Sequence, residues 1–454
     1  MADIEARRLN ATLGLGHDHR AAYGQFFTPQ TVARFMASLF DFDDVPIELL
    51  DPGAGIGSLT AAFAHAAGKR KIHASCFEID AHFQSDLRKT LQDLPNVNAT
   101  VLALDFIEAT VRKLTLDGRN AYTHVIANPP YKKIGTTSLA RRLVSKLGLE
   151  TSNLYAAFMA CAIAQSARNA QIVAIVPRSF MNGPYFKAFR YWLLDRVALV
   201  RIHLFDRRDM AFADDKVLQE NVILKMVAGG EQGNVVVSSS ADDSFADLHE
   251  HVLPFDEIVT PGDADLFIHV PAPRAPRSLT LKGGSLQELD IDVCTGPVVD
   301  FRLREHLQSQ PLEGSVPMLY AAHFSGGLQW PRDGRKPNAI SVNAQTRSWL
   351  MPNGCYVVTR RFTSKEEKRR IVAHVLPANA LPGERLGFEN HLNVFHRSRH
   401  GLPESVAKGL CAYLNSQAVD DYFRTFSGHT QVNATDLRRL KYPSISELEA
   451  MANV

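Results

Sequence analysis

The sequence predicts an α/β domain built on a largely parallel sheet, followed by an α+β domain. Short apolar, β-branched runs alternate with helical patterns between residues 31 and 227, an alternation typical of parallel sheets covered on both faces. Four of these runs end abruptly at an acidic residue or at an Asn-Pro pair. Gly229-Gly230 and Ser238-Ser239-Ser240 then mark a composition shift, so we place the first domain at residues 1–230 and the second at residues 231–454.

The composition is that of a globular protein. The 454 residues are 45% hydrophobic with a net charge of +2, so bulk charge does not by itself indicate a nucleic-acid partner. No apolar run is long enough to span a bilayer and the first residues do not resemble a signal peptide, so we expect a cytoplasmic protein without a membrane partner. Five scattered cysteines without a Cys-x-x-Cys pair argue against disulfides or zinc, and we expect no metal.

The first predicted helix spans residues 31–40. Its apolar residues, Val32 and Phe35 among them, recur at helical spacing. Thr28 before Pro29 is typical of an N-cap with proline at the first helical position. Because the amino end of a helix carries a partial positive charge, this end is a natural seat for a carboxylate.

A predicted strand at residues 47–50 leads into the segment 51–57, Asp-Pro-Gly-Ala-Gly-Ile-Gly, and then into an alanine-rich helix at residues 58–67. Strand, glycine loop and helix open a nucleotide-type α/β fold, in which glycines let a ligand approach the backbone closely. The segment lacks the Gly-x-Gly-x-x-Gly spacing of dinucleotide sites and the Gly-Lys-Ser/Thr of phosphate-binding loops. Taken alone, it is equally compatible with a generic strand-to-helix turn.

Two further predicted strands, at residues 71–77 and 101–104, end at carboxylates. Glu78 follows the first of them, where doubly wound folds hold a ribose diol. Asp105 and Phe106 follow the second and suit an adenine ring, whose amino group would donate to the carboxylate and whose face would lie near the phenyl ring. Each acid could instead cap a helix or form a turn.

The segment Asn128-Pro129-Pro130-Tyr131 ends a predicted strand at residues 122–127. Proline has no N–H and fixes its own φ, so the chain must leave the sheet at the carboxyl edge, where open α/β sheets bind ligands. The Asn128 side-chain oxygen and the Pro129 carbonyl can accept both N–H bonds of a planar amino group and direct its lone pair at an electrophile. Tyr131 can stack on the ring that carries this group. The alternative is a strand-ending turn without chemistry.

The predicted first domain continues with helices at residues 153–167 and 184–194 and strands at residues 172–176, 198–205 and 221–227. Phe212 stands among polar residues in the loop before the last strand. It is either a loop anchor or an exposed platform for stacking.

The second domain has shorter apolar runs and more glycine and proline. We expect strands at residues 316–324, 354–362 and 392–395 and helices at residues 366–376 and 402–414. Basic residues gather at 360–370, 397–400 and 438–441, which favours phosphate contacts, although a charge run is usually only a solvated face. Neighbouring Asn, Gln and His side chains are candidates for contacts with base edges.

The order of these motifs resembles that of the γ-class DNA adenine-N6 methyltransferases of type II restriction–modification systems. The matching segments are Gly-Gln-Phe-Phe-Thr-Pro at 24–29, Asp-Pro-x-x-Gly-x-Gly at 51–57, Glu-x-Asp at 78–80, Asp-Phe at 105–106 and Asn-Pro-Pro-Tyr at 128–131. Segments 356–362, 387–393 and 428–433 are similar to the PstI/BsuBI-like branch of modification methylases, so the resemblance covers most of the chain. It implies a Rossmann-like, S-adenosylmethionine-dependent catalytic domain followed by a DNA target-recognition domain.

The resemblance implies a role for each matched position. For S-adenosylmethionine, the implied binding residues are Thr28 and Pro29 near the methionine part, Asp51, Gly53, Gly55 and Gly57 around the cofactor, Glu78 at the ribose, and Asp105 and Phe106 at the adenine. The implied catalytic residues, which would grip a flipped target adenine, are Asn128, Pro129, Pro130 and Tyr131. Phe212 would be a second aromatic against that base, with Phe205 in reserve. From the basic clusters we add Arg361, Arg397 and Arg438 as candidates for contacts with DNA.

The implied reaction transfers a methyl group to adenine N6 at a specific site in double-stranded DNA and protects that site from a cognate restriction endonuclease. The second half carries no nuclease signature, so we expect a separately encoded endonuclease. Because Asn-Pro-Pro-Tyr suits any planar amino group, RNA and protein glutamine remain alternative substrates. The alternative from another class is a DNA-binding scaffold with an inactive methyltransferase fold, against which the intact Asn128 and Tyr131 count.

Overall fold

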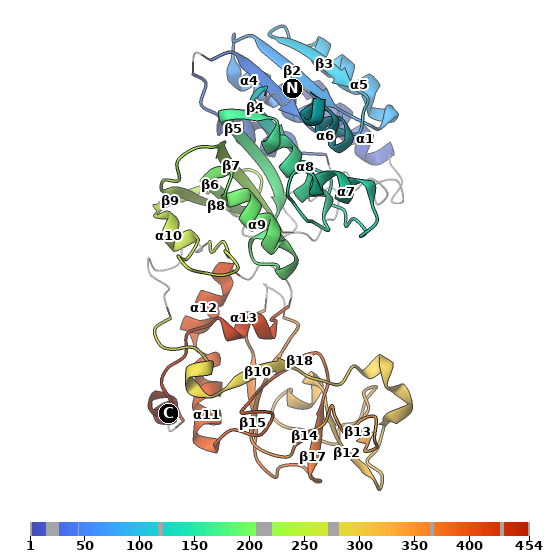
Figure 1. Ribbon diagram of the computed structural model, residues 1–454, viewed down its shortest axis with the longest axis vertical. Coiled ribbons are helices and arrows are strands. Elements are labelled where there is room, and N and C mark those ends of the chain that lie inside the picture. The colour runs from blue at the N-terminus through green and yellow to red at the C-terminus, as the bar shows by residue number, and fades with distance from the viewer. Residues whose placement is uncertain are drawn as a thin grey trace. The chain divides into compact units, whose positions relative to one another are not determined.

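The structure, a computed structural model, describes residues 2–14, 27–43, 45–116, 121–205, 220–270, 281–363, 367–426 and 431–452. The chain divides into two units, Met1–Pro273 and Arg274–Val454, which appear in Figure 1 and are described one at a time. No helix within the described residues combines the length and the apolar character needed to cross a membrane. Nor do three His, Cys, Asp or Glu side chains of those residues gather as ligands for a metal ion.

A nine-stranded sheet forms the centre of the first unit (Figure 1). In sheet order its strands are β3 (Val97–Leu102), β2 (Ile72–Phe77), β1 (Ile47–Asp51), β4 (Tyr122–Ala127), β5 (Ser166–Pro177), β7 (Asn221–Ala228), β6 (Val197–Phe205), β8 (Val235–Ser240) and β9 (His249–Leu253). The strands from β3 to β5 are parallel, and β7 pairs antiparallel with both β5 and β6. The predicted α/β fold class is confirmed for this unit.

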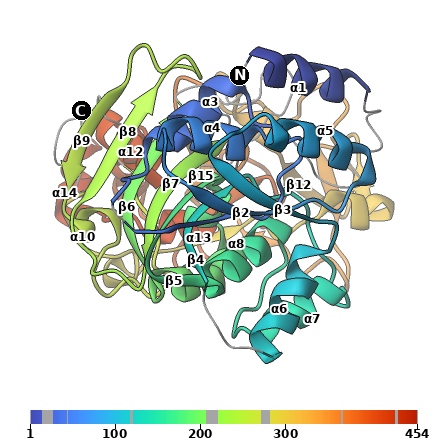
Figure 2. The same cartoon turned by 90° about the horizontal axis from the view of Figure 1, so that it is seen from above.

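Helices cover both faces of this sheet, as Figure 2 shows. Successive strand residues point to opposite faces, so Leu49 enters one hydrophobic core and Leu50 the other. The core around Leu49 is closed by α3 (Gln30–Ser38), α4 (Ser58–Ala67) and α5 (Ala81–Gln92), and the core around Leu50 by α6 (Phe106–Leu116), α8 (Leu154–Ala164) and α9 (Lys187–Leu194). The unit also contains α1 (Ala2–Gly14), α7 (Leu139–Ser145), α10 (Phe255–Ile258) and the 3-10 helices η1 (Arg178–Met181) and η2 (Pro184–Phe186).

The domain boundary predicted at residue 230 is wrong. β8 pairs with β6 and β9 pairs with β8, so the sheet continues past that point and the first unit extends to Pro273. The serine run is not a linker but the end of β8, where the hydroxyls of Ser238 and Ser240 lie 3.1 and 3.2 Å from the two ring nitrogens of the buried His203. The polar character of these serines suggested a linker, but in the structure they take part in a buried hydrogen-bonded network.

The third strand is displaced from its prediction. It spans Val97–Leu102 instead of residues 101–104, and Leu104 beyond it is 52% exposed. β3 is an edge strand whose residues alternate between partly buried and exposed, so it lacks the continuous apolar run on which the prediction depended.

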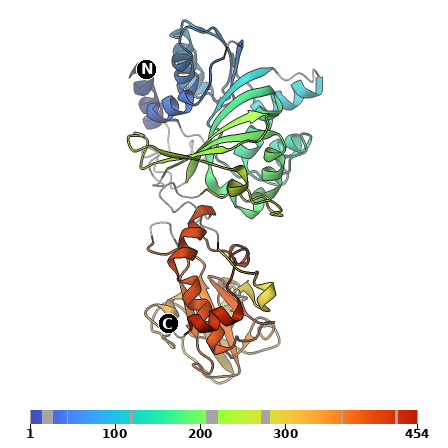
Figure 3. The same cartoon turned by 90° about the vertical axis from the view of Figure 1, so that its left-hand side faces the viewer.

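The second unit combines two small sheets with α-helices, seen from the side in Figure 3. One sheet has the order β10 (Asp292–Thr295), β18 (Leu392–His396), β15 (Tyr356–Arg360), β16 (Ala373–Leu376), and the other β11 (Leu307–Gln308), β13 (Ala339–Ser341), β12 (Ser315–Leu319), β17 (Arg385–Phe388), β14 (Met351–Pro352). The helices are α11 (Glu404–Leu414), α12 (Gln417–Phe426), α13 (Ala434–Arg438) and α14 (Ile445–Met451), with 3-10 helices η4 (Gln287–Leu289), η5 (Asp300–Arg302), η6 (Arg304–His306) and η7 (Ala321–Phe324).

The helix predicted at residues 366–376 is wrong. Ala373–Leu376 is strand β16, paired antiparallel with β15, and residues 367–372 form no helix. The backbone N–H of Arg370 donates to the Asp420 carboxylate at 2.6 Å. This contact with a distant residue overrides the helical preference of the local charged sequence.

Candidate active site

A cavity of about 270 Å³ lies at the carboxyl ends of the parallel strands in the first unit. These ends meet at one edge of the sheet, so segments distant in sequence converge there. The predicted residues that line it are Gly53 after β1, Glu78 after β2, Asp105 and Phe106 after β3, and Asn128 and Pro130 after β4. One pocket therefore joins the segment suited to a nucleoside with the segment suited to a planar amino group.

Glu78 is a buried carboxylate held by backbone groups. Its side chain is 3% exposed and accepts hydrogen bonds from the N–H groups of Gly55 at 2.8 Å and Asp80 at 2.7 Å. Burial raises the pKa of Glu78 to about 7, against the lowering effect of these two bonds. No lysine or arginine of the described residues forms an ion pair with Glu78, so its charge is not neutralised within the described part of the chain.

Two glycines of the loop have backbone conformations and close neighbours that leave no room for a side chain. Gly55 has a φ of +54°, and a Cβ at this position would lie 3.0 Å from the Phe27 ring. Gly57, with a φ of +89°, begins α4, and a Cβ there would lie 3.0 Å from Leu87. A side chain at either position would therefore strain the backbone and push on a packed neighbour.

Asp51 does not line the cavity, although the resemblance implied cofactor binding. It is fully buried and accepts the hydroxyl hydrogen of Thr60 at 2.8 Å, which ties the end of β1 to α4. Burial raises the pKa of Asp51 to about 7. Within the described structure, Asp51 therefore supports the glycine loop and does not face the cavity.

Aromatic rings make up one wall of the cavity. The ring of Phe106 lies 5.0 Å from that of Phe77 and 5.3 Å from that of Phe158. Asp105 beside them accepts the N–H of Glu108 at 2.9 Å and so starts α6. Phe27, Phe77 and Phe158 also line the cavity but were not predicted as site residues. In the sequence, an apolar residue that lines a pocket looks the same as one that packs in the core. The helix α8, which carries Phe158, is apolar on all sides.

The Asn128 side chain has a fixed orientation. Its amide nitrogen donates to the hydroxyl of Thr28 at 3.0 Å, and Thr28 is only 4% exposed. Thr28 is not the N-cap of α3, as the sequence suggested, because the cap position is taken by Pro29. The structure thus joins Thr28 to the Asn-Pro-Pro-Tyr segment.

The Tyr131 side chain is held in place by other residues of the first unit. Its hydroxyl donates to the Ile175 carbonyl at 3.2 Å, and its ring meets Tyr155 edge-on with centroids 6.3 Å apart. Burial raises the pKa of Tyr131 well above its ordinary value. Phe212, the predicted second aromatic, lies outside the described residues.

The arginines predicted to contact DNA are engaged inside the second unit. Arg397 pairs with Asp290 at 3.0 Å and Arg438 with Asp292 at 2.7 Å. Arg361 donates to the Asn390 carbonyl at 3.2 Å. These bonds use the guanidinium groups for local structure.

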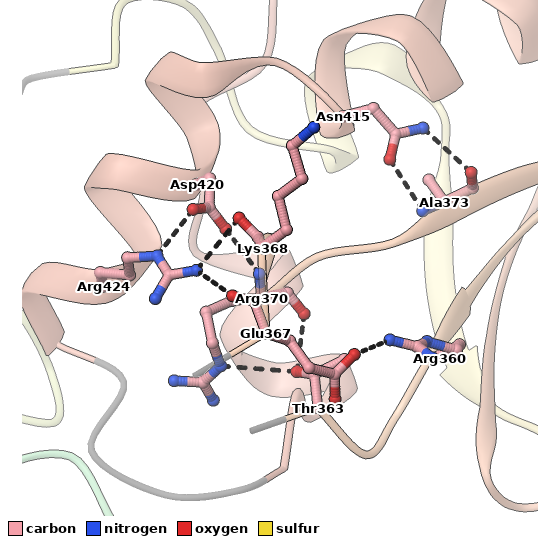
Figure 4. Close-up of polar contacts among 9 residues, drawn as sticks. All are labelled: Arg360, Thr363, Glu367, Lys368, Arg370, Ala373, Asn415, Asp420 and Arg424. Atoms are coloured by element: carbon pink, nitrogen blue, oxygen red, sulfur yellow. Dashed lines mark hydrogen bonds and ion pairs between the residues drawn. The ribbon is translucent and has the colours of Figure 1, made fainter. Parts of the chain in front are cut away.

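Arg360, Arg370 and the nearby Arg424 are engaged in the same way, as Figure 4 shows. Arg360 is bonded to Glu367, and Arg424 pairs with Asp420 at 2.6 Å. Arg370 is fully buried, and its Nε lies 3.4 Å from the Thr363 hydroxyl. These three guanidinium groups therefore belong to an internal hydrogen-bonded network.

Known proteins similar to this chain define its family. A model of the Eco57I restriction-modification methylase family matches residues 59–212. The type II methyltransferase M.BsuBI of Bacillus subtilis is 46% identical over 445 residues, covering 94% of this chain and 88% of the relative. The type II methyltransferase M.PstI of Providencia stuartii is 43% identical over 472 residues, covering 99% of this chain and 92% of the relative.

A solved structure shares the fold over nearly the whole length. The match to the DrdV–DNA complex has a TM-score of 0.54 at 12% identity, covers 99% of this chain and spans 59% of that one. This likeness concerns the fold alone, whereas the two curated relatives are similar in sequence from end to end. The chain belongs to the PstI/BsuBI-like type II methyltransferases of restriction–modification systems.

Proposed function

We propose that this protein transfers a methyl group from S-adenosylmethionine to the N6 amino group of an adenine in double-stranded DNA. The observation that carries the proposal is that one cavity is lined by Glu78, Asp105 and Phe106 and also by Asn128 and Pro130. One part of this set suits a nucleoside and the other a planar amino group. Membership of the type II methyltransferases agrees with DNA as the substrate.

The cavity residues fit S-adenosylmethionine. Glu78 keeps a buried carboxylate that is not paired with a described cation, and the two hydroxyls of a ribose can donate to it. The rings of Phe77, Phe106 and Phe158 offer an apolar wall for adenine, and Asp105 offers an acceptor for its amino group. When bound, the cofactor supplies a methyl group already activated by its positively charged sulfur.

Asn128 and Pro129 then orient the nitrogen that attacks. The Asn128 side-chain oxygen and the Pro129 carbonyl accept the two N–H bonds of the adenine amino group, which turns its lone pair toward the methyl carbon. This orientation would let the nitrogen take the methyl group as its bond to the cofactor sulfur breaks, and the extra proton on nitrogen would leave to water. Thr28 holds the other end of the Asn128 amide, so the oxygen rather than the nitrogen faces the substrate.

The target base must leave the duplex to reach this pocket, at a cost of a few kcal/mol. Tyr131, fixed by its bond to Ile175, is proposed to receive the flipped base, together with Phe212. The second unit is proposed to recognise the DNA target. The physiological partner would be a separately encoded restriction endonuclease for the same site, and both proteins would act in the cytoplasm.

The test is transfer of labelled methyl groups from S-adenosylmethionine to plasmid DNA, RNA and a protein extract offered in parallel. Label confined to DNA, and a melting temperature that rises with S-adenosylmethionine concentration, would support the proposal. Label in RNA or protein with none in DNA would replace the substrate. No label, with no thermal shift at saturating cofactor, would favour a DNA-binding scaffold.

A further inference from the structure

The second unit leaves Phe362 partly exposed to solvent. Phe362 is 44% exposed and Phe301 is 60% exposed, whereas the other described phenylalanines are buried or half-buried. A single exposed apolar side chain needs no explanation. The polar groups that meet around Phe362 give this one its significance.

Three segments distant in sequence meet at Phe362. It forms an antiparallel bridge with Gln431, and its ring lies 4.9 Å from the ring of His391. The backbone fixes this meeting, since the N–H of Arg361 donates to the His391 carbonyl at 2.9 Å and the N–H of Val432 to the Arg361 carbonyl at 2.7 Å. Residues directly opposite each other on paired segments present their side chains on one face.

The polar side chains on this face are oriented by contacts with neighbouring residues. The Nδ1 atom of the half-exposed His391 lies against the carboxylate of Glu389, which is 1% exposed, so Nε2 is the nitrogen available to another molecule. A guanidinium nitrogen of Arg361 lies 3.5 Å from the Gln431 amide oxygen. Among the described residues, the Gln431 amide nitrogen has no partner. A phenyl ring, an imidazole and an amide are thus presented together.

An exposed cation lies in the turn that follows a segment paired with Glu389 and Asn390. Val298 bridges Glu389, and the Asn390 N–H donates to the Val298 carbonyl at 2.9 Å, which places the following turn beside this segment. In that turn the guanidinium of Arg302 lies 5.5 Å from the centre of the Phe301 ring. Arg302 is exposed and forms no ion pair with any described carboxylate, unlike the arginines at 397 and 438.

We infer that Phe362, His391 and Gln431, with Arg302 from the turn after Val298, form the surface that reads the sequence of duplex DNA; we call it the reading face. A glutamine amide matches the N6 and N7 groups of adenine, and an imidazole can bond to a base edge or a phosphate. A phenyl ring can contact a thymine methyl group or enter a base step. Arg361 is then a positioning residue for Gln431. This inference rests on the proposed function, because it assigns DNA to the second unit.

The test compares variants of the full-length protein on DNA. Sequencing of plasmid methylated by the wild type first gives the recognition sequence. Phe362→Ala, Gln431→Ala and Arg302→Ala are then assayed on this sequence and on sequences with one altered base pair, with binding measured at several salt concentrations. Leu312→Ala, an exposed apolar residue, and Arg347→Ala, an exposed arginine, serve as controls outside the reading face.

Each variant has a distinct expected effect. Gln431→Ala lowers discrimination at one base pair by about 5- to 150-fold. Phe362→Ala weakens methylation of the recognition sequence by a similar factor, and Phe362→Leu recovers part of it if the ring makes an apolar contact rather than a stack. Arg302→Ala weakens binding to all sequences equally and lowers the slope of log affinity against log salt by about 1. The two control variants behave like the wild type in every assay. All variants keep the wild-type affinity for S-adenosylmethionine and the wild-type melting temperature.

Two outcomes separate this inference from the proposed function. Wild-type affinity and wild-type sequence preference in both Phe362→Ala and Gln431→Ala would overturn the reading face while leaving DNA methylation intact. Failure of the wild type itself to methylate any DNA would overturn the proposed function, whatever the variants do.

Discussion

Glu78 in the first unit and Asp292 in the second are carboxylates held in opposite ways. In the first, Glu78 is a buried carboxylate held by backbone N–H groups, and burial raises its pKa to about 7. In the second, partial burial of Asp292 opposes ionisation, but Arg438 outweighs it and lowers the pKa of Asp292. A buried acid kept without a cationic partner is suited to a ligand. A partly exposed ion pair is a minor contribution to structure.

The largest effect is expected for Asn128→Ala. Loss of the acceptor for the target amino group should lower the rate of methyl transfer by about 100- to 1,000-fold, or roughly 3–4 kcal/mol. The affinity for S-adenosylmethionine should be unchanged. Single-turnover kinetics and cofactor titration measure the two quantities separately, with Asn98→Ala on the exposed side of β3 as the control. Wild-type turnover in Asn128→Ala would remove Asn128 from the chemistry.

The pH dependence of stability tests the buried acid. Since burial raises the pKa of Glu78 from 4.5 to about 7, the folded chain binds this proton more tightly than the unfolded chain. The contribution to the free energy of unfolding is fully present below pH 4.5 and is lost as pH rises through 7, an effect on the order of 3 kcal/mol. Denaturant titrations from pH 4.5 to 8 should therefore show a shallower decline for Glu78→Gln than for the wild type.

S-adenosylmethionine should also flatten this decline, because ribose hydroxyls favour the ionised carboxylate. Burial also raises the pKa of Asp51 to about 7. The Glu78→Gln variant should therefore keep part of the decline in stability with rising pH. A slope that neither the substitution nor the cofactor changes would contradict the role of Glu78.

Gly55→Ala should lower the affinity for S-adenosylmethionine by about tenfold, through roughly 1–2 kcal/mol of backbone strain and the push on Phe27. Gly68→Ala is a matched control, because Gly68 also has a positive φ of +67° but a Cβ there would meet nothing within 4 Å. Isothermal titration of both variants isolates crowding of the cavity from strain alone. Equal losses of cofactor affinity in the two would refute the crowding.

Thr28→Val tests the orientation of Asn128. Loss of the hydroxyl acceptor should lower the transfer rate by about 5- to 10-fold, near 1 kcal/mol, with little change in cofactor affinity. Thr28→Ser, which keeps the hydroxyl, should restore the rate. If the cofactor affinity falls and the rate with bound cofactor does not, Thr28 instead contacts the cofactor, as the family resemblance implies.

The smallest effect is expected in the second unit. Arg438→Ala breaks a partly exposed ion pair and should change the free energy of unfolding by less than about 1 kcal/mol. It should leave the sequence preference of methylation untouched. A loss of sequence preference at one base pair would show that Arg438 leaves Asp292 to bind DNA.

The contrast between the units also explains what the sequence could predict. The meeting of Glu78 and Asn128 in one cavity could be predicted because the ends of parallel strands converge on one edge, so local motifs carry three-dimensional information. The partner of Thr28 lies 100 residues away and that of Arg438 lies 146 residues away. No local pattern announces such pairs, so the sequence suggested a helix cap and a free cation in their place.

The chemical identity of the methylated atom tests the proposed reaction most directly. DNA methylated by the wild-type protein would be digested to nucleosides for mass spectrometry and sequenced as single molecules. We predict N6-methyladenine confined to one short sequence. Methylcytosine, or N6-methyladenine spread without sequence preference, would contradict the grip of Asn128 and Pro129 on an adenine amino group or the recognition assigned to the second unit.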